Sequence, residues 1–333
     1  MGINNKLEKD IEVMEPGCER EDRIVETARE QGKGKLLLLT LVSYFFFSFA
    51  LRELAKLFGS RIPFLYSAIC SVVVSQVGLI LPAICYLWKN KYNPVKFLKI
   101  RFLHPLTIIL LVIFAYASYP IIIFCNYISM RVSENVVGNA LSSSFTEYPI
   151  WICVLVIAGI PCIVEEFIFR GVLYQSYRST GLVKAGITTA ILFGLFHLNI
   201  NQMSYAIVLG MFFVALNEIT GSILSSMVVH FVINGTSVFL SSKIHSVAGN
   251  FTVDTTNSVV SSGLMILVLG FMSLVSLVIL GVLLYAIVCL EKRQEAVREI
   301  WETKGEQTGS ILSPFLVITL LICIGVMIWN QIG

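Results

Sequence analysis

Residues 148–177 read YPIWICVLVIAGIPCIVEEFIFRGVLYQSY, a run long and apolar enough to cross a membrane that nevertheless contains Glu165, Glu166 and Arg170. A membrane-spanning helix needs about 20 mostly apolar residues. A single charge at the centre of such a helix costs roughly 2.5–3.5 kcal/mol on insertion scales, so three charges in one segment need a reason. The stretch therefore indicates a transmembrane helix that carries a polar site.

The whole chain has the same apolar character. Of its 333 residues, 56% are hydrophobic and 14% are charged, and the mean hydropathy is +0.82. Soluble domains have about 45–50% apolar and about 25% charged residues, so a soluble domain, a disordered chain and a coiled coil are excluded. The net charge of +3 comes without a basic stripe, and no nucleic-acid partner is expected. The eight cysteines are scattered without a CxxC pair, which argues against a disulfide framework.

Nine stretches are apolar enough to form spans, although the fifth and sixth are short. The sequence thus predicts an all-α, polytopic transmembrane helix bundle with about nine spans, or eight if one short stretch does not cross. The predicted spans are residues 36–52, 62–88, 105–129, 148–177, 182–199, 203–218, 222–241, 262–290 and 311–331.

The distribution of Lys and Arg predicts a cytosolic N-terminus, because these residues gather in cytosolic loops. Residues 1–35 are rich in both signs of charge and are interpreted as a cytosolic arm, and 36–333 as a transmembrane domain whose core at about 148–241 carries the intramembrane polar residues. Glu218 is expected at the cytosolic end of its span, within reach of lipid headgroups. The charged run 291–306 is expected to be a solvated helix. The chain is predicted to be a multi-pass integral membrane protein, of the plasma membrane if it is prokaryotic.

Helical geometry divides the charges of the fourth span. Glu166 and Arg170 are four residues apart, about 40° apart around the helix, which is the spacing of a helical ion pair. Glu165 points about 140° away from Arg170 and is left to another partner. Pro161 lacks an N–H group, frees the carbonyl of Ile157 and can bend the helix just before the two carboxylates.

Three further polar residues lie inside predicted spans. His197 ends the segment FGLFH of residues 193–197, and His230 and Asn234 delimit HFVIN, so that the last two share one helix face. Counting about 1.5 Å per residue from the cytosolic helix ends places these groups at nearly the depth of Glu165. Four polar groups from three helices are therefore predicted to meet in one layer, opening toward the cytosolic side.

Such a set of residues can hydrolyse an amide. A carboxylate beside an imidazole can hold and deprotonate a water molecule, which suits Glu165 and His197. His230 and Asn234 offer N–H donors to the oxyanion of a tetrahedral intermediate. The HExxH and GxSxG signatures of zinc proteases and serine hydrolases are absent from the sequence.

These motifs resemble those of the CPBP intramembrane proteases, which include CAAX prenyl proteases of the Ras-converting type and bacteriocin-processing or self-immunity proteins. The family's EExxxR, FxxxH and HxxxN motifs stand here, complete and in order, as EEFIFR (165–170), FGLFH (193–197) and HFVIN (230–234). The resemblance implies that Glu165 and His197 activate water. It also implies that His230 and Asn234 form the oxyanion hole, and that Glu166 and Arg170 support the site.

The expected function is therefore an intramembrane endopeptidase that cuts a membrane-associated or prenylated protein or peptide at the lipid bilayer. A non-catalytic bacteriocin self-immunity protein and a proton-coupled transporter remain as alternatives, although the transporter has no use for an oxyanion pair. No cofactor is predicted, because Arg170 would repel a dication near Glu166. Zinc held by Glu165, His197 and His230 is the alternative.

Overall fold

The computed structural model describes residues 16–133, 147–248, 262–302 and 311–332, and every regular element in these ranges is a helix. Within them, eight helices are long and apolar enough to cross a membrane, so the prediction of an all-α, multi-pass bundle is confirmed. These eight helices run over Gly32–Phe58, Ala68–Lys89, Pro105–Ser129, Ile150–Thr180, Ile200–Thr220, Leu224–Lys243, Gly263–Leu290 and Pro314–Gln331.

The N-terminal elements differ from the predicted spans mainly at their ends. The helix α2 begins within the predicted arm, at Pro16, and continues without a break through the first span; residues 1–15 lie outside the described ranges. The elements of this part are α2 (Pro16–Phe58), η1 (Pro63–Tyr66), α3 (Ala68–Lys89), α4 (Pro94–Phe97), α5 (Pro105–Ala117) and α6 (Tyr119–Ser129).

The fourth span changes its helical type along its length. Two π-helical stretches, η2 and η3, flank the short α-helix α10, and Pro161 lies in the first turn of α10, directly after η2. The helix thus changes its type next to Pro161, where the sequence predicts a disturbance. π-helical turns are rare and occur often at functional sites. The span consists of α9 (Ile150–Cys153), η2 (Val154–Gly159), α10 (Ile160–Glu166), η3 (Phe167–Leu173), α11 (Tyr174–Tyr177) and η4 (Arg178–Thr180).

The predicted span 182–199 is shorter in the structure, because α12 ends at Leu195. Leu198 has a left-handed backbone with φ of 52°, which a helix cannot continue through. The Asn199 side chain is the N-cap of the next helix and accepts hydrogen bonds from the backbone N–H groups of Asn201 and Gln202. The remaining elements are α12 (Leu182–Leu195), α13 (Ile200–Thr220), α14 (Leu224–Ala248), α15 (Ser262–Leu290), α16 (Gln294–Glu302) and α17 (Pro314–Ile332).

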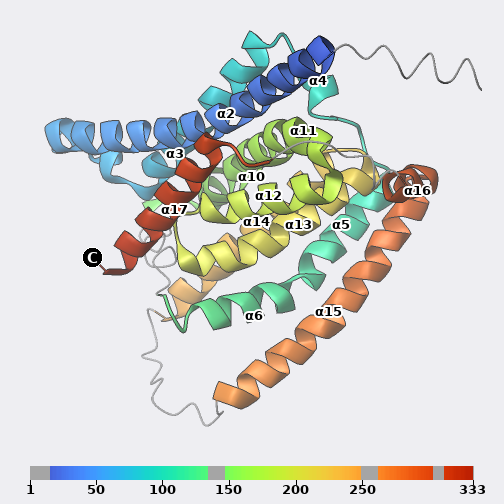
Figure 1. Cartoon of the computed structure of the whole chain (residues 1–333). Helices are drawn as coiled ribbons and strands as arrows, with labels where there is room; N and C mark the ends of the chain where they lie inside the picture. The colour runs from blue at the N-terminus through green and yellow to red at the C-terminus, as the bar shows by residue number, and fades with distance from the viewer. Residues whose placement is uncertain (1–15, 134–146, 249–261, 303–310, 333) are drawn as a thin grey trace, which may run out of the picture.

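The motif-bearing helices occupy the middle of the bundle (Figure 1). α13 packs against α12 and α14, α10 packs against α14, and α12 packs against η3. α2, α3 and α17 lie on one side of these helices, and α5, α6 and α15 lie on the other. The largest cluster of buried apolar side chains runs through these central helices and includes Phe169, Phe193, Phe213 and Val229. Any polar group held among them is shielded from both water and lipid.

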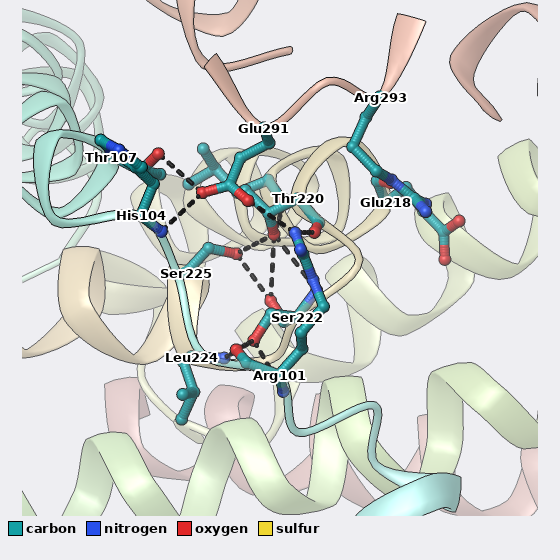
Figure 2. A network of polar contacts seen from close by, with 11 residues as sticks. Arg101, His104, Thr107, Glu218, Thr220, Ser222, Leu224, Ser225, Glu291 and Arg293 are labelled. Atoms are coloured by element: carbon teal, nitrogen blue, oxygen red, sulfur yellow. Dashed lines mark hydrogen bonds and ion pairs between the residues drawn. The ribbon is translucent and has the colours of Figure 1, made fainter. Parts of the chain in front are cut away.

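A network of polar contacts joins the end of α15 to the start of α5 (Figure 2). Glu291 follows α15 and accepts hydrogen bonds from the backbone N–H of His104 (3.0 Å), the Thr107 hydroxyl (2.7 Å) and the Arg101 guanidinium (2.6 Å). Only 3% of its side chain is exposed. The expectation of a solvated helix over 291–306 is therefore wrong at this residue, because α5 and Arg101 provide enough donors to bury the carboxylate.

The expectation that Glu218 reaches lipid headgroups is also wrong. Its side chain is 11% exposed and forms ion pairs with Lys99, in the loop before α5, and Arg178, in η4. Two cations that come from distant parts of the sequence thus hold the carboxylate inside the protein.

Candidate active site

The carboxylates of the first motif lie at the end of α10, where it passes into the π-helical stretch η3. Glu166 is fully buried. Its Oε1 atom accepts hydrogen bonds from Nη1 of Arg170 (2.8 Å) and from Nδ1 of His230 on α14 (2.9 Å). The ion pair predicted from the four-residue spacing is present, and His230 is a partner of Glu166 that the spacing did not indicate.

Aromatic rings enclose Arg170. The centre of its guanidinium lies 4.1 Å from the ring centroid of Phe193 on α12 and 4.8 Å from that of Phe213 on α13. A cation over an aromatic face is attracted by the ring quadrupole, and more strongly when water is excluded. The guanidinium is therefore held by one carboxylate and two rings. Phe213 also stacks on the His230 imidazole, with 5.2 Å between the ring centroids.

Glu165 has different surroundings from its neighbour. Its Oε1 atom accepts a hydrogen bond from the side-chain amide of Gln76 on α3 (3.3 Å). Its Oε2 atom is buried without a hydrogen-bond partner among the described residues and lies 3.8 Å from Nε2 of His230. The Oε2 atom of Glu166 also has no hydrogen-bond partner among the described residues, so the two carboxylates differ in their charge partners: Arg170 pairs with Glu166, whereas no Lys or Arg of the described residues pairs with Glu165.

Gln76 was not identified from the sequence. It lies in an otherwise apolar span and is 7% exposed. A lone amide in such a helix is a signal that something polar faces it, because an unpaired polar group in hydrocarbon is costly. The signal does not say which residue is the partner.

The tautomer of His197 follows from one contact. Its Nδ1 atom lies 2.8 Å from the backbone carbonyl oxygen of Phe193. A carbonyl oxygen only accepts, so Nδ1 carries the proton and the Nε2 atom of the neutral ring keeps its lone pair. The ring of Phe193 contacts both imidazoles edge to face, with its centroid 5.0 Å from that of His197 and 5.8 Å from that of His230.

The structure thus brings Glu165, Glu166, Arg170 and His230 into direct contact, and places His197 against them through Phe193. Asn234 lies one turn beyond His230 on α14, partly exposed, and its amide has no hydrogen-bond partner among the described residues. Its donors are free to bind another molecule.

The arrangement of the side chains bears on the zinc alternative, whose ligands would be Glu165, His197 and His230. In the described parts of the chain, no three His, Cys, Asp or Glu side chains are grouped so that they could hold a metal ion. Both imidazole Nδ1 atoms are used in hydrogen bonds, and the guanidinium of Arg170 lies against Glu166.

Comparison with known proteins gives one match. Residues 146–236 match the family model described as type II CAAX prenyl endopeptidase Rce1-like, and this segment contains all three motifs. No curated protein and no solved structure matches the chain. The match confirms the resemblance to CAAX-type intramembrane endopeptidases that the motifs carry. The segment that holds the candidate site is similar to the Rce1-like family of CAAX prenyl endopeptidases.

Proposed function

We propose that the chain is an intramembrane endopeptidase in which Glu165 and His197 activate the water that cleaves the peptide bond. The observation that carries this proposal is that the two adjacent carboxylates have different partners. Glu166 is paired with Arg170 and with His230, whereas Glu165 has no Lys or Arg partner among the described residues and presents its buried Oε2 atom to Nε2 of His230 at 3.8 Å. Such an oxygen is able to accept a proton from a bound water.

In the proposed reaction, the water lies between Glu165 and the Nε2 lone pair of His197. Glu165 takes one proton as the oxygen of the water forms a bond to the carbonyl carbon of the substrate. The tetrahedral intermediate then collapses, the C–N bond breaks, and Glu165 returns its proton to the leaving nitrogen. The products are a carboxylic acid and an amine, so the atoms of water and peptide are all accounted for.

The oxyanion of the intermediate is assigned to His230 and Asn234. The Nδ1–H group of His230 donates to Glu166. The proposal requires a proton on Nε2 of His230 as well, and this Nε2–H group donates to the oxyanion. Asn234 adds an amide N–H from the next turn of the same helix. Preorganised donors of this kind typically contribute about 10²–10³-fold to the rate.

An apolar groove beside the site supports a substrate that carries an apolar chain. The cavity has a volume of about 470 Å³ and lies between α5, η2–α10 and α14. It is lined by Leu155, Cys162 and Ile163 before the carboxylates, and by Met227 and Phe231 around His230. We propose that it holds the apolar part of a membrane-associated substrate, such as the prenyl chain that the family description names.

The orientation of the chain is part of the same proposal. With the N-terminus in the cytosol, the site opens toward the cytosolic face, as the excess of Lys and Arg at those span ends favours. Cysteine labelling of an introduced cysteine in the arm, with and without membrane permeabilisation, tests this directly.

The decisive experiment compares the purified wild-type protein with Glu165→Gln on prenylated and unprenylated forms of one peptide. We expect a defined fragment, detected by mass spectrometry, whose rate falls by about 10²–10⁴-fold in the variant. Glu295→Gln, which changes an exposed carboxylate on α16, serves as the control and should leave the rate unchanged. An undiminished rate in Glu165→Gln would refute the water-activation role. A wild-type protein that yields no fragment would favour an immunity protein or a transporter.

We further propose that the cleavage needs no metal. A carboxylate with an imidazole can activate water unaided, and Arg170 opposes a dication at Glu166. We expect activity to persist after exhaustive chelation, with no stoichiometric transition metal by elemental analysis. About one zinc per chain, with activity lost on removal and restored by zinc, would contradict this.

A further inference from the structure

A second polar cluster lies at the C-terminal end of the motif-bearing span. Arg178 in η4 is 13 residues beyond Glu165, which corresponds to about 20 Å along a helix. It meets Lys99 of the loop before α5 at the carboxylate of Glu218 on α13. Lys99 donates to Oε1 at 3.2 Å, and Arg178 donates to Oε1 at 3.2 Å and to Oε2 at 3.0 Å. Two cations thus share one acid.

A third cation reaches the same acid residue through its backbone. Arg293, after α15, donates from Nη2 to the carbonyl oxygen of Glu218 at 3.4 Å. Figure 2 shows Arg293 extending down from the α15 side to Glu218. It lies over Gly221, where a Cβ atom would come within 3.2 Å of its guanidinium carbon. Positive charge is therefore in excess of negative charge around Glu218.

Both the backbone conformation and the pKa of Lys99 are unusual. Its backbone is left-handed, with φ of 53°, and its carbonyl accepts the N–H of Ile223 at 3.2 Å. A strained backbone at a non-glycine residue persists only where its surroundings fix it, and such residues are frequent at ligand clamps. Burial lowers the pKa of the Lys99 amine, and the charges of Arg178 and Arg293 lower it further, although Glu218 acts in the opposite direction. A bound anion would offset the repulsion between the Lys99 amine and the two guanidinium groups.

A cavity opens directly beside these cations. Its volume is about 460 Å³, and it is lined by Lys96, Phe97, Lys99, Gln175, Arg178 and Ser179. Three cationic groups, an amide and a hydroxyl face it, and no carboxylate does. Lys33 of α2 donates to the Ser179 hydroxyl at 3.4 Å, which adds a further positive charge behind the wall. Lys96 forms no ion pair with the described residues.

The cavity lies at the level of the span ends, and two aromatic side chains mark that level. Trp88 at the end of α3 is 83% exposed, and Tyr92 between α3 and α4 is 36% exposed. Exposed aromatic rings at span ends are typical of the headgroup region of a bilayer. Basic pockets between transmembrane helices at this level are suited to anionic lipid headgroups.

We propose that this cavity binds a phosphate group, and that its position at headgroup level assigns that group to an anionic phospholipid. Arg178 and Lys99 contact the phosphate from one side, and Lys96 contacts it from α4. Their donors match the acceptor oxygens of a phosphate, which favour charge-assisted hydrogen bonds. The lipid would connect the loop before α5 to the end of the motif-bearing span.

The test uses the full-length protein in detergent and a short-chain phosphatidic acid as the probe, with binding measured by native mass spectrometry. Lys96→Gln removes a lining cation without breaking an ion pair between described residues. We expect it to weaken probe binding about fivefold, the effect of one cation near a membrane surface. Lys89→Gln changes an exposed lysine at the same end of α3 that does not line the cavity, and should bind like the wild type.

Three outcomes would overturn the proposal: no binding of the probe, equal binding by Lys96→Gln and the wild type, or equal weakening by Lys89→Gln, which would indicate general surface attraction. Inorganic phosphate provides the second arm. If it displaces the probe at equal concentration, in a manner that depends on Lys96, the ligand is free phosphate and the lipid assignment is wrong. The double variant Lys96→Gln, Arg178→Gln should weaken binding of the probe further. If the double variant does not fold, the comparison of Lys96→Gln with the wild type decides the proposal.

Discussion

At the scale of single residues, the pair of Glu166 and Arg170 has the largest expected effect on stability, because neither side chain is exposed at all. We expect Arg170→Gln to lower the free energy of unfolding by about 3–5 kcal/mol, since it leaves a buried carboxylate with only His230 to oppose its charge. The double variant Glu166→Gln, Arg170→Gln should recover part of this loss. Folded yield after extraction and the apparent melting temperature measure both effects. A double variant as unstable as Arg170→Gln alone would contradict the pairing.

The same pair shows what could be predicted about the site from sequence. Its spacing along one helix fixed the Arg170 contact in advance, because helix geometry is local. The contact of Glu165 with Gln76 joins residues 89 positions apart, and the partnership of Glu166 with His230 joins residues 64 apart. Contacts of that kind depend on how helices pack, which neither composition nor periodicity specifies.

At the scale of helices, the α12–α13 hairpin holds His197 in its turn and depends on Gly194. A Cβ atom there would lie 2.8 Å from the backbone oxygen of Met203 and 2.5 Å from Cγ1 of Ile207. We expect Gly194→Ala to separate the two helices and lower the rate of cleavage, although Ala favours a helix by about 1 kcal/mol over Gly. Backbone atoms cannot move aside as a side-chain end can.

The control is Gly325→Ala in α17, where an added Cβ atom meets nothing within 4 Å. It should leave the rate unchanged and stabilise slightly. Specific activity and melting temperature of the two variants, measured side by side, separate a local displacement from a general effect of losing glycine. A Gly194→Ala protein as active as the control would show that the hairpin tolerates the displacement.

Eight of the nine predicted spans correspond, in the predicted order, to helices long enough to cross a membrane, because apolar length is a strong signal; the fifth predicted span corresponds to the shorter helix α12. Their ends agree less well, and α12 illustrates the cause: Leu198 has a left-handed backbone, and Asn199 caps the next helix, which hydropathy does not register. The π-helical stretches around α10 were also not predicted. Pro161 indicated a disturbance there, but a bend and a change of helical type have the same signature in sequence.

At the scale of the whole molecule, the hydrogen bonds of Glu291 hold the end of α15 against the start of α5. Burial raises the pKa of its carboxyl group, but hydrogen bonds from Thr107, the His104 backbone and Arg101, together with the charge of Arg101, lower the pKa below its usual value overall. A lowered pKa contributes stability that is present above about pH 4.3, the unfolded value, and is lost as the pH falls through the folded value.

We therefore expect Glu291→Gln to lower the stability at neutral pH by about 1.5–3 kcal/mol, as for one hydrogen bond to a charged group. The difference from the wild type should shrink in acid. Melting curves in detergent from pH 7 to pH 3 measure it. Glu295→Gln, which alters an exposed carboxylate four residues away, is the matched variant. A constant difference across this range would contradict the role of the ionised carboxylate.

The shortness of α12 has a consequence for the lipid around the protein. Its 14 residues measure about 21 Å, whereas the hydrocarbon core of a bilayer is about 30 Å thick. Val183, Ile187 and Ile191 form an exposed stripe along it, so lipid chains contact this short element directly. Such hydrophobic mismatch thins the adjacent bilayer at a cost of fractions of a kcal/mol per Å. The thinned zone would bring bulk water nearer to the turn that carries His197, and we expect the protein to cleave faster in bilayers of short-chain lipids than in thick, sterol-rich ones.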